Sequence, residues 1–231
     1  MRIAIIGAGQ IGQVLTRRFR GVGHDVGVAN SRGPQSLAAL ARETGATAVR
    51  VEDAVRGRDL VVVTIQLKNV PTLPKGLFGH LPKAFPVIDT CNYYPRTRDG
   101  RIAAIEDGMP ESVFVEKQIG HPVVKAFNNV YAAKLMDGGR ANGARDRIAL
   151  PIAGDQPAAK PIVMKLVEEL GFDTVDAGIL ATFWRQQPGT PVYCTDLNAG
   201  AVHLALYQAS PVRPPNLFAT AHSPGTWDDP R

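Results

Sequence analysis

The sequence has few of the residues that hold metals or disulfides, and no long apolar runs. Its 231 residues include two cysteines, too few for a disulfide framework or a paired-cysteine metal motif, and five histidines that stand apart from one another. No apolar run reaches the ~20 residues that cross a bilayer, and Met1 leads directly into a predicted strand rather than a signal peptide. We therefore expect a cytoplasmic protein without a metal site or a membrane partner.

The sequence also lacks the clustered basic and aromatic residues that are typical of nucleic-acid binding. The formal net charge is +5, but the cations are scattered, and Arg17, Arg18 and Arg20 lie at the end of a predicted helix, where they complement its dipole. Positive charge therefore points to a small anionic ligand. With 45% hydrophobic and 20% charged residues, we expect a globular protein with a large domain at 1–181 and a small helical C-terminal segment with an irregular tail at 182–231.

A glycine-rich turn follows the first predicted strand, Arg2–Ile6. The turn reads Gly7-Ala8-Gly9-Gln10-Ile11-Gly12 and opens a predicted helix. Gly7 permits the tight turn, Gly9 lets a pyrophosphate approach the backbone, and Gly12 lets the helix pack closely on the strand. The helix N-terminus then attracts the anion through unpaired N–H groups. The strand, turn and helix in this order predict a dinucleotide site.

The second predicted strand, Asp25–Ala29, ends without the carboxylate that would bind an unphosphorylated ribose. Asn30 stands there instead and is followed by Ser31 and Arg32. A hydroxyl and a guanidinium can bind a 2′-phosphate, which a carboxylate would repel. The sequence therefore predicts NADP(H) rather than NAD(H), although Ser31 and Arg32 could also be ordinary turn residues.

Strands and helices alternate along the rest of the chain. This pattern predicts an α/β fold of the Rossmann type, with a doubly wound, mainly parallel sheet. Ligands bind at the carboxyl ends of such strands. The expected groove residues after the later strands are Ile65, Gln66, Thr90, Cys91, Asn92, Phe127, Asn128 and Asn129. Helices are expected at 34–43 and at 52–55, and a further strand is expected to follow the segment from Lys75 to Lys83. A strand, helix and strand are expected from Ile148 to Val175, and an Ala/Leu-rich helix at 196–209 suggests a homodimer.

Four blocks of sequence resemble the NADPH:coenzyme F-420 oxidoreductase family and its bacterial relatives. They are residues 1–7 with the glycine turn, Asn30-Ser31-Arg32, residues 123–128, and residues 151–155 leading to 175–178. The resemblance covers about residues 1–180. It implies that Ser31 and Arg32 bind the 2′-phosphate and that Gly9, Gln10 and Ile11 contact the pyrophosphate. Family members often have a hydroxyl residue where Gln10 stands and a lysine near Gln35 and Ser36, so this chain departs from the pattern there.

The hydride acceptor is less clear from the residues. A flavin or coenzyme F-420 accepts hydride at a ring atom while solvent supplies the proton, which suits a sequence with few evident acid–base groups. A small carbonyl or imine would need a proton donor, for which His203, Tyr207 and, less well placed, His121 are candidates. Trp184 could form a wall of the acceptor pocket, or simply pack in the core. A third alternative is a redox sensor that binds NADP(H) without turnover.

Overall fold

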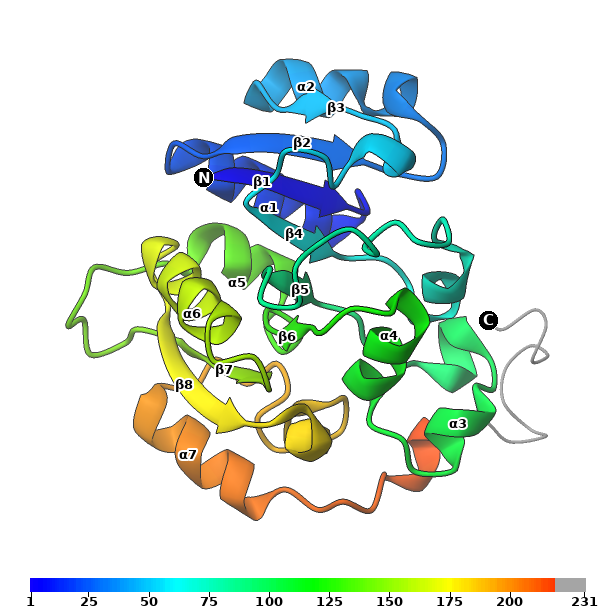
Figure 1. The fold of residues 1–231 in the computed structure, drawn as a ribbon. Helices are drawn as coiled ribbons and strands as arrows, with labels where there is room; N and C mark the ends of the chain where they lie inside the picture. The colour runs from blue at the N-terminus through cyan, green and yellow to red at the C-terminus, as the bar shows by residue number, and fades with distance from the viewer. Residues whose placement is uncertain (219–231) are drawn as a thin grey trace.

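An eight-stranded sheet forms the centre of the protein (Figure 1). The computed structural model describes residues 1–218. The strand order is β3-β2-β1-β4-β5-β6-β7-β8, and the first six follow the order of dinucleotide-binding sheets. The strands are β1 (Arg2–Ile6), β2 (Asp25–Ala29), β3 (Thr47–Ala48), β4 (Leu60–Val63), β5 (Val87–Asp89), β6 (Val124–Lys125), β7 (Ala149–Gly154) and β8 (Asp173–Gly178).

The central strands are apolar because both of their faces are covered. Ile3, Ile5 and all of β4 have no exposed surface, as expected for parallel strands between two layers of helices. β1 pairs in parallel with β2 on one side and β4 on the other. These parallel pairings bring the carboxyl ends of the strands to one edge of the sheet.

Helices cover both faces of the sheet (Figure 1). One core cluster joins the sheet to α1, α2, α5 and α6, a second joins it to α3 and α4, and a third joins β7 and β8 to α7. The helices are α1 (Gln10–Gly21), α2 (Ala38–Thr44), α3 (Ala103–Glu106), α4 (Glu111–Ile119), α5 (Ala132–Asp137), α6 (Ala159–Glu169) and α7 (Ala199–Gln208). The shorter turns are η1 (Pro34–Leu37), η2 (Val51–Asp53), η3 (Leu67–Thr72), η4 (Pro95–Asp99), η5 (Leu180–Gln186) and η6 (Pro215–Leu217).

The predicted doubly wound, mainly parallel sheet is confirmed, but one junction runs the other way. β7 is antiparallel to β6, while β7 and β8 are parallel to each other around α6. β6 and β7 are joined by the six-residue α5 and a loop. The pair β7 and β8 therefore extends the sheet in the opposite direction.

Several segments between the strands differ from the sequence-based expectation. The stretch from Lys75 to Lys83 forms turns, and the expected helix at 34–43 begins as the 3₁₀ turn η1. Helices α3 and α4 were not predicted. α3 has four residues, too short to show a helical period, and α4 buries both the charged Glu111 and the polar Ser112, which obscures its apolar face.

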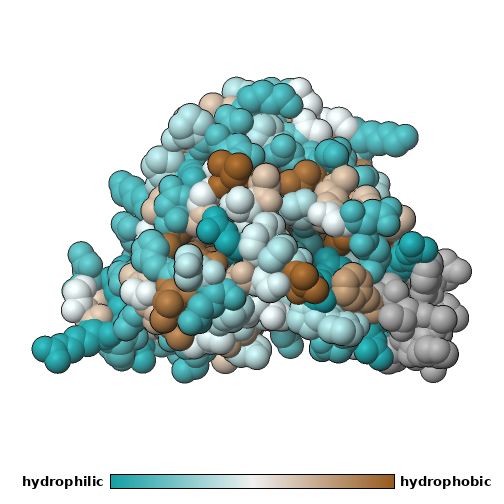
Figure 2. All heavy atoms as spheres, turned by 90° about the horizontal axis from the view of Figure 1, so that it is seen from below, coloured by the Kyte–Doolittle hydropathy of each residue, from teal (hydrophilic) through white to brown (hydrophobic). Residues whose placement is uncertain are grey.

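The helix α7 packs on β7 and β8 with one side and exposes the other. Val202, Ala205 and Leu206 are buried, whereas Leu204 and Tyr207 are 56% and 87% exposed. Figure 2, which views the molecule from below, shows hydrophobic residues as separate patches among hydrophilic ones. The homodimer stays a prediction. In the described part of the chain, no helix is long and apolar enough to cross a membrane.

Candidate functional site

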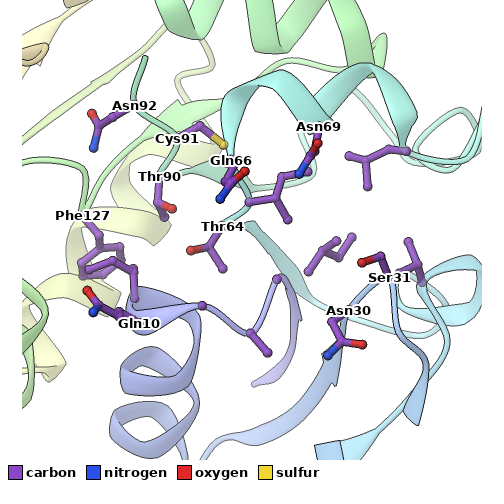
Figure 3. Close-up of a pocket in the computed structure, with 18 of the residues that line it drawn as sticks. Gln10, Asn30, Ser31, Thr64, Gln66, Asn69, Thr90, Cys91, Asn92 and Phe127 are labelled. Atoms are coloured by element: carbon purple, nitrogen blue, oxygen red, sulfur yellow. The ribbon is translucent and has the colours of Figure 1, made fainter. Parts of the chain in front are cut away.

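A cleft of about 1540 Å³ opens at the edge where the parallel strands end (Figure 3). Asn30 and Ser31 lie at one end of the cleft, Asn92 and Phe127 lie at the other, and Thr64 and Thr90 lie between them. The lining includes these predicted residues: Gly7, Gly9, Gln10, Ile11, Asn30, Ser31, Arg32, Ile65, Gln66, Asn92 and Asn128. The predicted Gly12 is buried beneath the loop instead. The structure therefore brings the predicted site residues together, while their role in binding stays a prediction.

The three glycines of the first turn have different surroundings. Gly7 has a φ of 116°, and a Cβ there would lie 2.1 Å from the backbone oxygen of Thr64. A Cβ on Gly12 would lie 2.0 Å from the Gly7 oxygen. Around Gly9, by contrast, a Cβ would meet no atom of residues 1–218 within 4 Å. The packing of the described chain thus requires Gly7 and Gly12, whereas open space at Gly9 faces the cleft and suits a ligand that approaches the backbone.

The start of α1 lines the same cleft, and in the described part of the chain its first backbone N–H groups have no side-chain cap. The hydrogen bond from the Gln13 N–H to the Gly9 oxygen, at 2.9 Å, is an i to i−4 bond at the start of the helix. Within residues 1–218, no side chain caps this helix end, and its first turn has no acidic residue. The free N–H groups and the helix dipole can therefore bind a phosphate.

A short turn shapes the end of the cleft next to β2. The Asn30 Oδ1 accepts a hydrogen bond from the Arg32 N–H at 3.0 Å, and the Asn30 Nδ2 donates to the Ser36 Oγ at 2.9 Å, while the Ser36 hydroxyl donates to the Gly33 oxygen. Asn30 thus fixes the backbone that carries Ser31 and Arg32, both of which are exposed. Because Asn30 is amide rather than carboxylate, this turn leaves the Arg32 charge available for an anion.

Sequence reasoning missed a second charged wall at this end. Arg50, Val51 and Glu52 line the cleft just beyond β3. The strand β3 has only two residues, which is too short for an alternating pattern of apolar and polar residues to show in the sequence. The position of Arg50 follows from the pairing of β3 with β2.

At the end of the cleft next to Asn92, a buried ion pair lies behind the lining residue Cys91. Lys125 Nζ and Asp89 Oδ2 lie 2.9 Å apart on the paired strands β6 and β5, and neither side chain has any exposed surface. Asp89 accepts from the Cys91 N–H at 2.8 Å, and Lys125 donates to the Cys91 oxygen. The pair thus holds both backbone groups of Cys91, which lines the cleft. Burial raises the pKa of the Cys91 thiol well above its usual value, so the thiol stays neutral.

A buried carboxyl group lies next to this ion pair. Glu111, at the start of α4, is 1% exposed and accepts the Tyr93 N–H at 3.0 Å. Burial raises the pKa of Glu111 to about 7, although the positive charges of Lys125 and Arg213 oppose the shift. Glu111 therefore titrates near neutral pH.

Two amide side chains connect the strand ends at the same end of the cleft. The Asn92 Nδ2 donates to the Asn128 oxygen at 2.9 Å, and the Asn128 Nδ2 donates to the Gln186 oxygen at 2.8 Å. Between β6 and Asn128, Phe127 has a φ of 61°, an uncommon value for a residue with a side chain. This backbone turns the chain so that Phe127 and Asn128 both line the cleft.

Two tyrosines that the sequence analysis did not single out complete this end. The Tyr94 and Tyr193 hydroxyl groups are hydrogen-bonded to each other, and both residues line the cleft. Burial raises the pKa of each phenol, so both remain protonated at neutral pH. Cys194 anchors this segment by donating its N–H to the Asn129 oxygen at 3.0 Å. Tyr94 and Tyr193 come from irregular segments, so no periodicity marked them.

The acid candidates from the sequence lie elsewhere. His203 and Tyr207 are exposed on α7, outside the lining of the cleft. His121 is buried, and its ring nitrogens contact the backbone oxygens of Pro122 and Pro82. Trp184 is half-buried in η5 and is not part of the cleft wall. Sharing one face of a helix did not bring His203 and Tyr207 to the site, because that face points away from the sheet.

The comparisons with known proteins match the first part of the chain most specifically. Residues 2–93 match the family described as "NADP oxidoreductase coenzyme F420-dependent". The Escherichia coli (strain K12) protein YjhV is 45% identical over 82 residues, which are 34% of this chain and 60% of that protein. The chain therefore matches less than two thirds of the length of that curated relative.

Two crystal structures are similar over most of the chain. A hypothetical protein, SMa0349, from Sinorhizobium meliloti is 28% identical with a TM-score of 0.68, over 86% of this chain and 95% of that one. A protein from Arthrobacter sp. FB24, provisionally named an F420-dependent NADP-reductase, is 23% identical with a TM-score of 0.62, over 79% and 86% of the two chains. At that identity, the second likeness supports the fold. Residues 2–93 are thus similar to the family of coenzyme F-420-dependent NADP oxidoreductases.

Proposed function

We propose that the protein is an NADP(H)-dependent oxidoreductase. When bound, the cofactor would supply hydride. The observation that carries the proposal is the combination of open space at Gly9 with a serine and an arginine, rather than a carboxylate, beyond β2. The first feature suits a pyrophosphate and the second suits a phosphorylated ribose.

The strand order suggests which residues would bind each part of the cofactor. Neighbouring strands lie ~4.8 Å apart, so the ends of β2, β1, β4 and β5 form a row of about 14 Å across the cleft. Ser31 and Arg32 would bind the phosphorylated ribose at one end, and the start of α1 would bind the pyrophosphate. Thr90, Cys91 and Asn92 would then face the nicotinamide, with Cys91 held rigidly by Lys125 and Asp89.

We propose a planar acceptor, coenzyme F-420 or a flavin, at the end next to Asn92, Tyr94 and Tyr193. The similarity of residues 2–93 to the F420-dependent family supports this choice, as does a cleft whose volume exceeds that of an ordinary small-ligand pocket. For such an acceptor the chain mainly needs to align two rings and exclude water, and Phe127 and the two tyrosines provide apolar surfaces for this.

The test is titration with NADPH and NADH, followed by stopped-flow mixing of the NADPH complex with coenzyme F-420, FMN and FAD. We expect tighter binding of NADPH and rapid loss of its absorbance with one of the three acceptors. Equal or tighter binding of NADH would refute the cofactor assignment. Tight binding of NADPH without oxidation by any acceptor would instead favour a redox sensor.

A second candidate is the reduction of a small carbonyl or imine, which the Tyr94 and Tyr193 pair favours. Two protonated hydroxyl groups in hydrogen-bond contact could pass a proton to an oxygen or nitrogen acceptor. Tyr94→Phe and Tyr193→Phe would then lower turnover of the carbonyl or imine while leaving the affinity for NADPH unchanged. Unchanged turnover in both variants would exclude this mechanism.

A further inference from the structure

The end of the cleft next to β2 has two walls that come from neighbouring strands. β3 pairs in parallel with β2, with Thr47 opposite Gly27 and Ala48 opposite Val28, and the Val49 N–H donates to the Val28 oxygen at 2.9 Å. Both strands therefore end at the same edge. The turn after β2 provides Ser31 and Arg32, and the segment after β3 provides Arg50 and Glu52 to the same cleft.

These walls have two cations and one anion. Within residues 1–218, the Arg32 guanidinium has no hydrogen bond or ion pair, whereas Arg50 Nε lies 3.4 Å from Glu52 Oε2. The side chains of Arg50 and Glu52 are 70% and 57% exposed. An ion pair in such contact with water is weak, so a doubly charged phosphate can compete for the guanidinium.

The turn itself offers the phosphate little beyond Ser31 and Arg32. The nearby Ser36 hydroxyl already contacts Asn30 and donates to the Gly33 oxygen. Further positive charge for an anion bound here must therefore come from the opposite wall, where Arg50 is the cation that lines the cleft.

We infer that Arg50 is a second guanidinium for the ribose 2′-phosphate and that Glu52 competes with this phosphate for it. The inference rests on the proposed NADP(H) site and names two further residues that set its preference for NADPH over NADH. Binding of the phosphate replaces the contact between Arg50 and Glu52, so Glu52 limits the affinity for the phosphorylated cofactor. An unphosphorylated ribose makes no such exchange and is insensitive to both residues.

Equilibrium titration of the full chain with NADPH and NADH, followed by cofactor fluorescence, tests the inference. Glu52→Gln should bind NADPH about two- to fivefold more tightly than the wild type, because it frees Arg50 and removes a repelling charge. Arg50→Gln should bind NADPH roughly fivefold more weakly. Neither substitution should change the dissociation constant for NADH.

A matched control lies six residues beyond Arg50. Arg56 forms an equally exposed ion pair with Asp53 at 3.1 Å, but neither residue lines the cleft. Arg56→Gln removes the same charge as Arg50→Gln and should leave both dissociation constants unchanged. An equal loss of NADPH affinity in Arg56→Gln would show a general charge effect and overturn the inference.

The outcomes separate this inference from the proposed function. If the wild type does not prefer NADPH, the proposed cofactor is wrong. If the wild type prefers NADPH and that preference is unchanged in Arg50→Gln and Glu52→Gln, the proposed function stands and the role of Arg50 is refuted. Because both side chains are exposed, we expect the melting temperatures to match that of the wild type, which thermal unfolding can verify.

Discussion

Gly7 and Gly9 lie two residues apart in one turn, but only Gly7 is constrained by the packing of the described chain. Gly7 has a positive φ, and the Thr64 backbone lies where its Cβ would be. Gly9 has an ordinary φ of −74° and open space around it. Substitution at these two positions can therefore separate the demands of folding from those of binding.

We predict that Gly9→Ala keeps the fold but loses the cofactor. The free energy of unfolding should fall by less than about 1 kcal/mol, the order of a changed helix N-cap. NADPH affinity should fall at least tenfold, because the methyl group occupies the space that a pyrophosphate needs. Urea unfolding and NADPH titration of the same preparation measure both quantities.

Gly7→Ala is the comparison variant. Its clash with the backbone should destabilise the whole protein by several kcal/mol, so binding and stability should be lost together. If Gly9→Ala bound NADPH as the wild type does, the glycine turn would not be the pyrophosphate site.

At the scale of elements, two short strands are joined by one buried ion pair. Asp89 ends β5, Lys125 ends β6, and Ser112 on α4 donates a hydrogen bond to the same carboxylate at 2.8 Å. Such a pair contributes little net stability compared with apolar residues, but removing one partner leaves a buried charge unpaired.

We predict that Lys125→Met lowers the free energy of unfolding by about 3–5 kcal/mol. The double variant Lys125→Met with Asp89→Asn should recover much of this loss, because asparagine is neutral and can still accept from Ser112. NADPH affinity should remain below that of the wild type in both variants, since the Cys91 oxygen loses its donor. Urea unfolding of the single and double variants gives the comparison, and an unfolding free energy of Lys125→Met within 1 kcal/mol of the wild type would contradict it.

Elements with a clear period could be predicted from the sequence, and irregular ones could not. The predicted bounds of β1 and β2 agree with the structure, because buried parallel strands have short apolar runs between glycines or polar residues. The rule that ligands lie at strand ends then indicated most of one cleft wall. Tyr94, Tyr193 and Arg50 were missed because their positions depend on the path of irregular segments and on the pairing of a two-residue strand.

At the scale of the whole molecule, Glu111 links three distant parts of the chain. It lies on α4, accepts the Tyr93 N–H after β5, and interacts with the charge of Arg213 near the end of the described residues. Because it is buried in the folded protein and exposed after unfolding, its ionisation couples global stability to pH.

The pKa of Glu111 is about 7 in the folded protein and near 4.5 in the unfolded chain. The folded state therefore binds more protons between these values, and the contribution of Glu111 to stability is lost as the pH rises from about 4.5 through about 7. We predict that Glu111→Gln gains stability relative to the wild type over this range, by on the order of 3 kcal/mol. Urea unfolding at pH 5 and at pH 8 tests this, and a difference between the two proteins that does not change with pH would refute it.

The cleft draws on two parts of the chain that meet at its middle. The turns after β1, β2, β3 and β4 lie within residues 2–93, whereas Tyr94, Arg98, Asn128 and Tyr193 come from later segments. Substitutions in the later segments can therefore reshape one end of the cleft while the end formed by the turns after β1, β2 and β3 stays intact.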